Sequence, residues 1–286
     1  MAVLLMLLSC AQAECISPTT GRVLPAEPVA PVIVSVNNGK EAPWGVEMAD
    51  IVYETPMAPG DHTRFAFVFH DALLTEESIH TGPVRSPREA HAILMKEWHA
   101  GLIANGSVRG NQAAAPGLKD NDGWFLNTYQ GRGRACASRL KGRKAPKNMD
   151  VDVLAVHRVQ GDPPALADGF AFADAAQALR PVEHIRLIWP HNTADFYYKD
   201  GEYCREGWEG GFANVIVQMV DGVMPVQGEG EAVVCMRGQR IPARWKKESA
   251  GEKTFFLTEN GAILTICTGR TFIAHLPVQF GKLDYQ

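Results

Sequence analysis

The chain has 286 residues, of which 46% are hydrophobic and 21% are charged. This composition is typical of a soluble globular protein with room for two domains, and it excludes a wholly disordered chain. A net charge of −4 and an isoelectric point near 6.1 exclude a general electrostatic attraction to nucleic acid. Any basic site must therefore be local.

Residues 1–13 have the features of an export leader or lipoprotein signal, although a positively charged n-region is missing. Residues 1–8 are almost wholly apolar and too short to span a membrane, but they have the length of a signal-peptide core. Ala11-Gln12-Ala13 has the small-x-small form that precedes cleavage, whereas residues 7–10 resemble a lipobox in which Cys10 accepts the lipid. A buried N-terminal strand of a cytosolic protein is the alternative. We expect an exported, extracytoplasmic protein, anchored to the membrane as a lipoprotein if Cys10 is modified.

Proline placement divides the rest of the chain into three parts. Residues 14–30 carry prolines with little periodicity, which predicts an extended tether. A second group of prolines, at residues 162–164 and 180–181, brackets an alanine-rich stretch. We therefore predict an N-terminal domain over residues 31–180 and a C-terminal domain over residues 181–286.

The N-terminal domain is predicted to be α/β with a mixed sheet. A helix is expected from Ser86 to about His99, because Ser86 suits the N-cap position, Pro87 the first helical position and Glu89 a capping box. Short apolar runs predict buried strands, the third of which is apolar on both faces and should be central in its sheet. These strands are residues 32–36, 50–55, 64–70 and 102–104.

The C-terminal domain is predicted to be mainly antiparallel, which makes the whole chain α+β. Residues 194–198 and 202–204 flank an Asp-Gly turn, and residues 254–258 and 262–267 flank an Asn-Gly turn. Such dipeptides between apolar runs indicate β-hairpins. Further strands are expected at residues 213–220, 232–236 and 271–276.

Two arginines at the predicted helix start indicate an anion-binding site. Arg85 and Arg88 face the positive end of the helix dipole, which is unfavourable unless a negative group lies nearby. An anionic ligand bound by guanidinium and backbone N–H groups would supply that charge. The alternative is a structural network in which Asp50 and Glu54 neutralise Arg64 and Arg85. The candidate ligand-binding residues are Arg64, Arg85, Ser86, Arg88, Asn105 and Ser107.

Catalytic motifs are weak, so the catalytic residues are unknown and a non-enzymatic role is favoured. Asp50 and Glu54 would lie about 13 Å apart on one strand, farther than the two carboxylates of a glycosidase. Ser107 is not in a G-x-S-x-G elbow. The sequence has no H-E-x-x-H motif, P-loop or dinucleotide fingerprint, so neither a metal nor a cofactor is expected. A hydrolase using Asp50, Glu54 or Ser107 remains the alternative.

Three further patterns favour structural interpretations. The basic run over residues 132–147 is typical of a solvated face, and nucleic acid is not expected as a partner because only Tyr129 lies nearby for stacking. The aromatic residues Tyr198, Tyr203, Trp208 and Trp245, with Arg205, are interpreted as core, with a sugar- or peptide-binding face as the alternative. The cysteines form no C-x-x-C pair and are interpreted as small buried residues, with one disulfide left open. They are Cys136, Cys204, Cys235 and Cys267.

Several motifs in one order resemble the YerB-like lipoproteins of bacteria, a family with two parts that are both domains of unknown function. The first-half motifs are Asp50-Ile51-Val52-Tyr53-Glu54, Thr63-Arg64-Phe65, Gly82-Pro83-Val84-Arg85-Ser86, Gly106-Ser107 and Ala145-Pro146-Lys147-Asn148-Met149. The second-half motifs are Tyr198-x-Asp200-Gly201-x-Tyr203-x-Arg205, Asn214-Val215-Ile216-Val217, Gly228-x-Gly230, Arg244-Trp245-Lys246-Lys247 and Gly269-Arg270-Thr271. The resemblance implies a surface-anchored envelope protein with Cys10 as the lipidated residue, and it carries no established activity.

The chain departs from the family pattern at two positions. Lys147 occupies a position where the family has histidine, and Asn105 occupies one where glycine is usual. If that histidine is catalytic in relatives, this chain lacks it. We therefore expect an envelope binding protein whose partner is an anionic small molecule, wall fragment or peptide, with a hydrolase of envelope material as the alternative.

Overall fold

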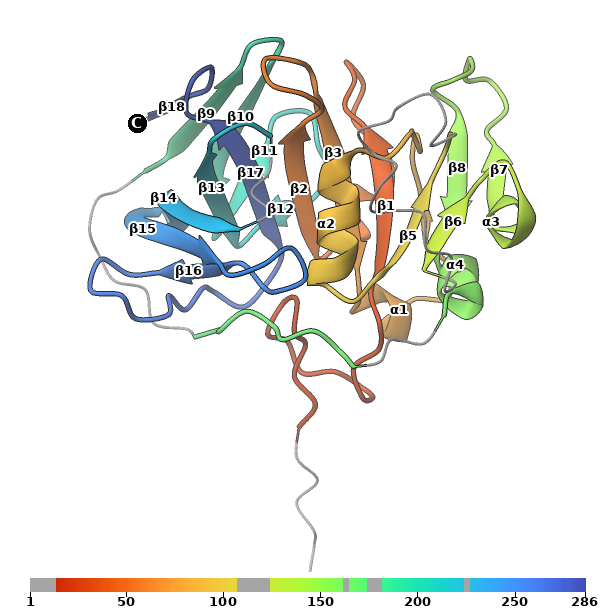
Figure 1. The fold of residues 1–286 in the computed structure, drawn as a ribbon, viewed down its shortest axis with the longest axis horizontal. Coiled ribbons are helices and arrows are strands. Elements are labelled where there is room, and N and C mark those ends of the chain that lie inside the picture. The colour runs from red at the N-terminus through yellow and green to blue at the C-terminus, as the bar shows by residue number, and fades with distance from the viewer. Residues whose placement is uncertain (1–13, 107–123, 162–164, 174–181, 224–226) are drawn as a thin grey trace, which may run out of the picture.

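The computed structural model describes residues 14–106, 124–161, 165–173, 182–223 and 227–286 (Figure 1). A mixed sheet of ten strands runs through both halves of the chain, in the order β16-β15-β14-β13-β17-β2-β3-β1-β5-β6. The N-terminal half supplies β1 (Val32–Asn37), β2 (Ile51–Pro56), β3 (Thr63–Phe69), β5 (Gly101–Ala104) and β6 (Phe125–Asn127). The C-terminal half supplies β13 (Asn214–Val220), β14 (Gly228–Met236), β15 (Gln239–Lys247), β16 (Phe255–Leu257) and β17 (Thr271–Pro277).

The two halves share this sheet because β17 lies between β13 and β2 and pairs in parallel with both. The boundary expected between residues 180 and 181 therefore does not separate two sheets. The C-terminal half is mainly antiparallel, as expected, although its strand β17 pairs in parallel with β13. The expected mixed sheet and antiparallel hairpins are present, and β3 is central as predicted, with every residue buried between β1 and β2.

Two smaller antiparallel sheets complete the fold. The five-stranded sheet has the order β12-β11-β10-β9-β18, and the three-stranded sheet has the order β4-β8-β7. The first contains β9 (His184–Trp189), β10 (Asn192–Lys199), β11 (Glu202–Arg205), β12 (Gly211–Phe212) and β18 (Lys282–Tyr285). The second contains β4 (His80–Thr81), β7 (Ala137–Arg139) and β8 (Met149–Asp152).

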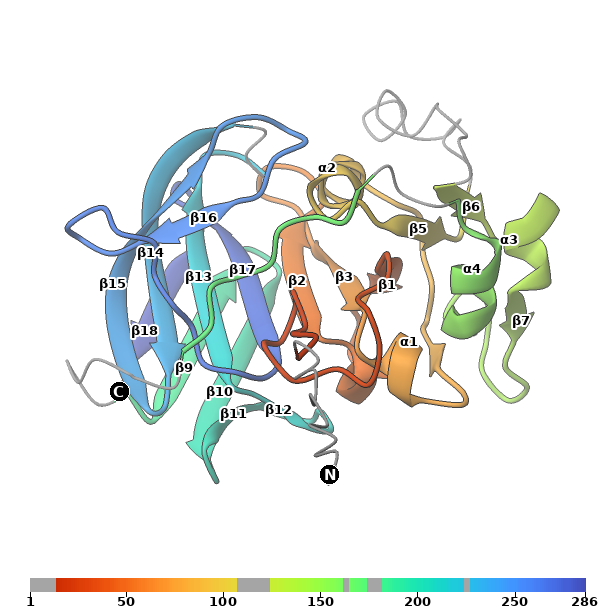
Figure 2. The ribbon, with the colours of Figure 1, turned by 90° about the horizontal axis from the view of Figure 1, so that it is seen from below.

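The central sheet is covered on both faces. One face packs against the five-stranded sheet, for example through the Phe196 and Phe272 rings, whose centroids are 4.8 Å apart. The other face packs against the helix α2 (Glu89–Glu97), whose Leu94 shares a hydrophobic cluster with Val68. Figure 2 shows α2 and the strands β10–β12 on opposite sides of the sheet. The remaining helices are η1 (Val46–Met48), α1 (Ala72–Thr75), α3 (Gly131–Ala135) and α4 (Val153–Val159).

Local sequence signals succeeded unevenly. The turn between β10 and β11 has positive φ at Asp200 (53°) and Gly201 (90°), as the predicted Asp-Gly hairpin requires. By contrast, residues 262–267 form only isolated bridges rather than the expected strand. The segment 14–30 is not an extended tether, because its Ser17, Thr19 and Thr20 are buried against the body of the protein.

Candidate functional site

The candidate residues gather at one edge of the central sheet. Strands β1, β5 and β6 are parallel, and β3 runs antiparallel to both β1 and β2. The carboxyl ends of β1, β2, β5 and β6 therefore meet the start of β3 at one edge. In sheets with parallel strands, ligands bind beyond this kind of edge.

Three arginines converge there on the loop that precedes α2. The Nη1 atom of Arg64, in β3, donates a hydrogen bond to the carbonyl oxygen of Ser86 at 2.9 Å. The Nη1 atom of Arg88 donates to the same oxygen at 3.3 Å and to the carbonyl oxygen of Pro87 at 2.9 Å. Two guanidinium groups therefore reach one carbonyl oxygen, while Arg85 belongs to the same loop.

No carboxylate among the described residues lies within ion-pair distance of Arg64, Arg85 or Arg88. Burial, together with the charges of Arg88 and Arg85, lowers the pKa of Arg64 to about 9, although the Asp61 charge opposes this shift. Burial also lowers the pKa of Arg88, with Asp61 raising it and Arg85 lowering it. Within the described part of the chain, the loop therefore carries positive charge that no ion pair neutralises.

Several buried polar atoms at this edge have no hydrogen-bond partner among the described residues. They include Nε of Arg64 and Arg85, Oδ1 of Asn105 and Oγ1 of Thr55. Arg64 is only 4% exposed and Asn105 only 6% exposed, so water reaches them poorly. Thr55 and Arg64 are cross-strand partners, and their side chains share one face of the sheet. Unpaired buried polar groups are costly, so a ligand or ordered water that satisfied them would be stabilised.

The helix start differs from the prediction. Helix α2 begins at Glu89 with Arg88 as its N-cap residue, and Ser86 instead donates its hydroxyl to the carbonyl oxygen of Asn105 at 3.0 Å. The N–H of Arg88 donates to Nδ1 of His91 at 3.1 Å, and Nε2–H of His91 donates to the carbonyl oxygen of Phe65 at 3.0 Å. Burial lowers the pKa of His91 to about 3, which keeps its ring neutral. The predicted cap is therefore replaced by a tertiary contact of Ser86 and by a local contact between Arg88 and His91.

Glu54 does not neutralise the arginines, so that part of the expected network is wrong. Its side chain is fully buried, and Oε2 accepts a hydrogen bond from Nη1 of Arg205 at 2.7 Å. Its Oε1 accepts from Asn38 Nδ2 and from Thr63 Oγ1, both at 2.7 Å, and from Asn192 Nδ2. The Arg205 partner comes from β11, in the other half of the chain.

Asp50 also pairs with groups other than the three arginines. Its Oδ2 accepts from the backbone N–H groups of His70 at 2.7 Å and Asp71 at 2.9 Å, and from the Thr19 hydroxyl at 3.0 Å. Burial and, after it, the neighbouring Asp71 charge raise its pKa to about 7, although the hydrogen bonds that the carboxylate accepts oppose this shift. The Ser17 and Thr20 hydroxyls donate to Asp71, which fastens the segment 15–24 to the body.

Asp50, His70 and Asp71 are close enough to share a metal ion, since their ligand atoms lie within 4.8 Å of one another. The protein, however, already uses these atoms. Nδ1–H of His70 donates to Asp71 at 2.9 Å, and Nε2 of His70 faces the Val29 N–H at 3.4 Å. We therefore interpret this cluster as structural.

The other predicted residues have mixed outcomes. Ser107 and Cys10 lie outside the described residues. The core interpretation of the aromatic group is confirmed for Tyr203 and Trp245, which are buried, and Trp208 packs against that core. The basic run is exposed, as expected, and three cysteines are buried, namely Cys136, Cys235 and Cys267. The part of the chain that the structure describes holds no helix long and apolar enough to cross a membrane.

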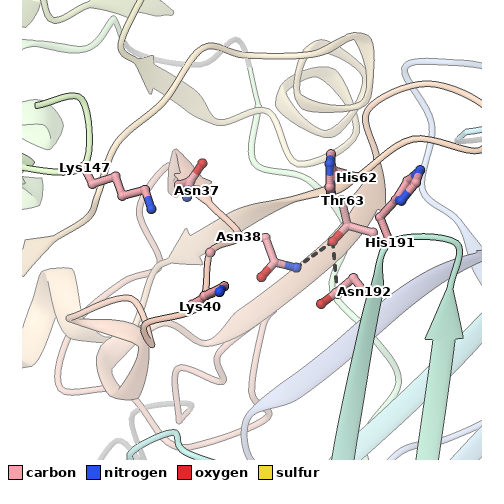
Figure 3. A pocket seen from close by; sticks show the side chains of 9 residues that line it. Asn37, Asn38, Lys40, His62, Thr63, Lys147, His191 and Asn192 are labelled. Carbon is pink, nitrogen blue, oxygen red and sulfur yellow. Dashed lines mark hydrogen bonds between the residues drawn. The ribbon is translucent and has the colours of Figure 1, made fainter.

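Sequence reasoning missed a second site at the same edge, a pocket of about 370 Å³ that we call the basic pocket (Figure 3). Its cationic and ionisable lining residues are Lys40, His62, Lys147 and His191. Lys147 was singled out only as a departure from the pattern that the resemblance implies, and no pocket was predicted, because His191 and Asn192 come from the other half of the chain.

Comparisons with known proteins agree with this architecture. A family model described as the DUF3048 N-terminal domain, a protein of unknown function, matches residues 19–162, and the DUF3048 C-terminal domain matches residues 197–273. The crystal structure of the YerB protein from Bacillus subtilis is similar, with a TM-score of 0.72 and 19% identity. The match covers 95% of this chain and 100% of that chain. No curated protein matches the chain. The chain therefore belongs to the YerB-like family with two domains of unknown function.

Proposed function

We propose that this protein binds an anionic ligand in the cell envelope, using Arg64, Arg85 and Arg88. The observation that carries the proposal is the gathering of these cations at one sheet edge with no carboxylate partner among the described residues. The two carboxylates that sequence analysis offered as partners are both buried and bonded to other groups.

Electrostatics supports an anion rather than a neutral ligand. Three guanidinium groups repel one another, and the lowered pKa values of Arg64 and Arg88 express that repulsion together with desolvation. A phosphate or carboxylate between them would relieve the repulsion and could accept paired hydrogen bonds from the planar guanidinium forks. The ligand classes that fit are an anionic small molecule, a wall fragment and a peptide carboxylate.

The start of α2 adds to this site. The backbone N–H groups of the first helical turn lack intrahelical partners and carry partial positive charge, so a helix start favours an anion. Arg88 is the N-cap residue of α2 and therefore stands at this end of the helix. The unpaired Nε of Arg64 and Oδ1 of Asn105 supply a further donor and an acceptor.

A ligand screen by thermal unfolding tests the proposal. Sulfate, phosphate, acetate and citrate are compared at one ionic strength on the parent, Arg85→Ala, Arg88→Ala and Arg244→Ala. Arg244 is the matched control, because it is exposed and pairs with Glu229 at 3.2 Å. We expect at least one anion to stabilise the parent and Arg244→Ala by mass action, and to lose most of that effect in the other two variants. Equal shifts in all four proteins would overturn the proposal.

The envelope location is a separate part of the proposal. It is supported by the leader-like residues 1–13 with their lipobox at residues 7–10. Metabolic labelling with a fatty acid should mark the parent in bacteria and leave Cys10→Ser unlabelled. Equal labelling of both proteins, or none in either, would refute lipidation at Cys10.

The two carboxylates of the hydrolase alternative, Asp50 and Glu54, are not accessible to a substrate. Glu54 is fully buried and Asp50 is 4% exposed, so neither reaches a substrate in this arrangement. Among the residues that the structure describes, no observation favours hydrolysis over binding.

A further inference from the structure

We propose that the basic pocket is a second, independent binding site, and that its ligand is a polyol phosphate with two anionic groups. The pocket opens at the junction of the two halves, between the end of β1, the start of β3 and the turn before β10. It is separate from the arginine site, because Thr63 lines the pocket while the next residue, Arg64, points to the opposite face of the sheet.

The lining of the pocket carries positive charge and no acid. Lys40 and Lys147 are exposed, and neither has a carboxylate within ion-pair distance among the described residues. The rings of His62 and His191 lie with their centroids 4.7 Å apart. Glu54 lies behind the lining residues Asn38, Thr63 and Asn192, which donate hydrogen bonds to it, and Arg205 neutralises its charge. An anion entering the pocket therefore meets cations without a competing carboxylate in the wall.

The charges are spread along the pocket. Figure 3 shows Lys147 on one side and the His62 and His191 rings on the other, with Asn37 and Asn38 between them. This spacing suits a ligand with one anionic group near the lysines and another near the imidazoles. The volume of about 370 Å³ exceeds what a single phosphate ion fills, since one water takes roughly 30 Å³ of liquid.

The remaining lining groups suit hydroxyls. Asparagine amides offer both donors and acceptors, so they pair with the hydroxyl groups of a sugar or polyol. Asn38 and Asn192 each use their Nδ2 group on Glu54, which fixes their orientation and keeps their carbonyl oxygens available to a ligand hydroxyl. Lysine binds phosphate as a point charge, so Lys40 and Lys147 suit a tetrahedral phosphate without demanding a planar partner. These groups together suit a phosphorylated polyol.

Calorimetric titration with a glycerol trimer joined by two phosphodiester groups tests the proposal. We expect saturable binding of this probe that weakens about tenfold in Lys147→Ala, the loss of roughly one charge-assisted hydrogen bond. Lys144→Ala is the matched control, because Lys144 is exposed and does not line the pocket.

Two further variants separate the possible outcomes. Replacing His62 and His191 together by alanine should also weaken probe binding, because their ring N–H groups no longer reach the second anionic group. Arg244→Ala should leave probe binding unchanged, because Arg244 is exposed and does not line the pocket. The proposal is overturned if no saturable binding occurs, if Lys144→Ala or Arg244→Ala weakens binding as much as Lys147→Ala, or if the double histidine variant binds the probe like the parent.

Discussion

Replacing Glu54 by glutamine should strongly destabilise the protein, because it breaks a buried ion pair. Glu54 is fully buried and Arg205 is 7% exposed, and their closest atoms are 2.7 Å apart. Glutamine keeps the size of the side chain and an oxygen for Asn38 and Thr63. Its amide nitrogen, however, must then face Nη1 of Arg205, a donor against a donor, which leaves the guanidinium buried without its counter-ion.

The expected loss is about 3–5 kcal/mol in the free energy of unfolding, the usual cost of removing one partner from a buried pair. Aromatic rings limit the loss, because the Arg205 guanidinium lies 4.3 Å from the ring centroid of Trp208 and 5.1 Å from that of Phe65. Replacing both partners, as in Glu54→Gln with Arg205→Met, should recover part of the stability, because no uncompensated charge remains.

Urea unfolding followed by fluorescence measures these differences, with Glu229→Gln as the matched control. Glu229 pairs with Arg244 at 3.2 Å, but its side chain is 62% exposed, so its loss should cost about 1 kcal/mol or less. If Glu54→Gln costs no more than the control, or if the double variant is less stable than Glu54→Gln, the reasoning about the buried pair is refuted.

Two further predictions concern the N-terminal segment. Because burial raises the pKa of Asp50 to about 7, the folded protein holds a proton there that the unfolded chain releases near pH 4. The free energy of unfolding of the parent, relative to that of Asp50→Asn, should therefore fall by up to about 4 kcal/mol as the pH rises from 4 to 8. A difference in urea unfolding that does not change with pH would contradict this. The double variant Ser17→Ala with Thr20→Ala removes two hydroxyl donors from Asp71, which should lower the free energy of unfolding by about 1–3 kcal/mol and cause early proteolysis near the N-terminus. The control is Thr193→Ala, since Thr193 is exposed. If the double variant is as stable as the control, the segment is not held by these hydrogen bonds.

Local sequence determined the strands and the tight turns. The runs that became β1, β2 and β3 are short and rich in β-branched or aromatic residues, and such residues pack well on a pleated, buried surface. The Asp200-Gly201 turn was also predictable, since positive φ at both positions follows from the residue types. The arginines near residue 86 were recognised as a site candidate because their charge opposes a helix start.

Tertiary structure decided the partners of those elements. Ser86 was expected to be the N-cap, yet its hydroxyl donates to the carbonyl oxygen of Asn105, and the helix begins three residues later. Glu54 was expected to pair with nearby arginines such as Arg64, ten residues away, yet it pairs with Arg205, 151 residues away. Strand β17 lies between β13 and β2, so the two expected domains share one sheet. Residue type and spacing specify which strands form and which face is apolar. The pairing of strands and of charged groups depends on contacts between residues that lie far apart in the sequence. Among the possible arrangements, the favoured one gives each buried polar group a partner.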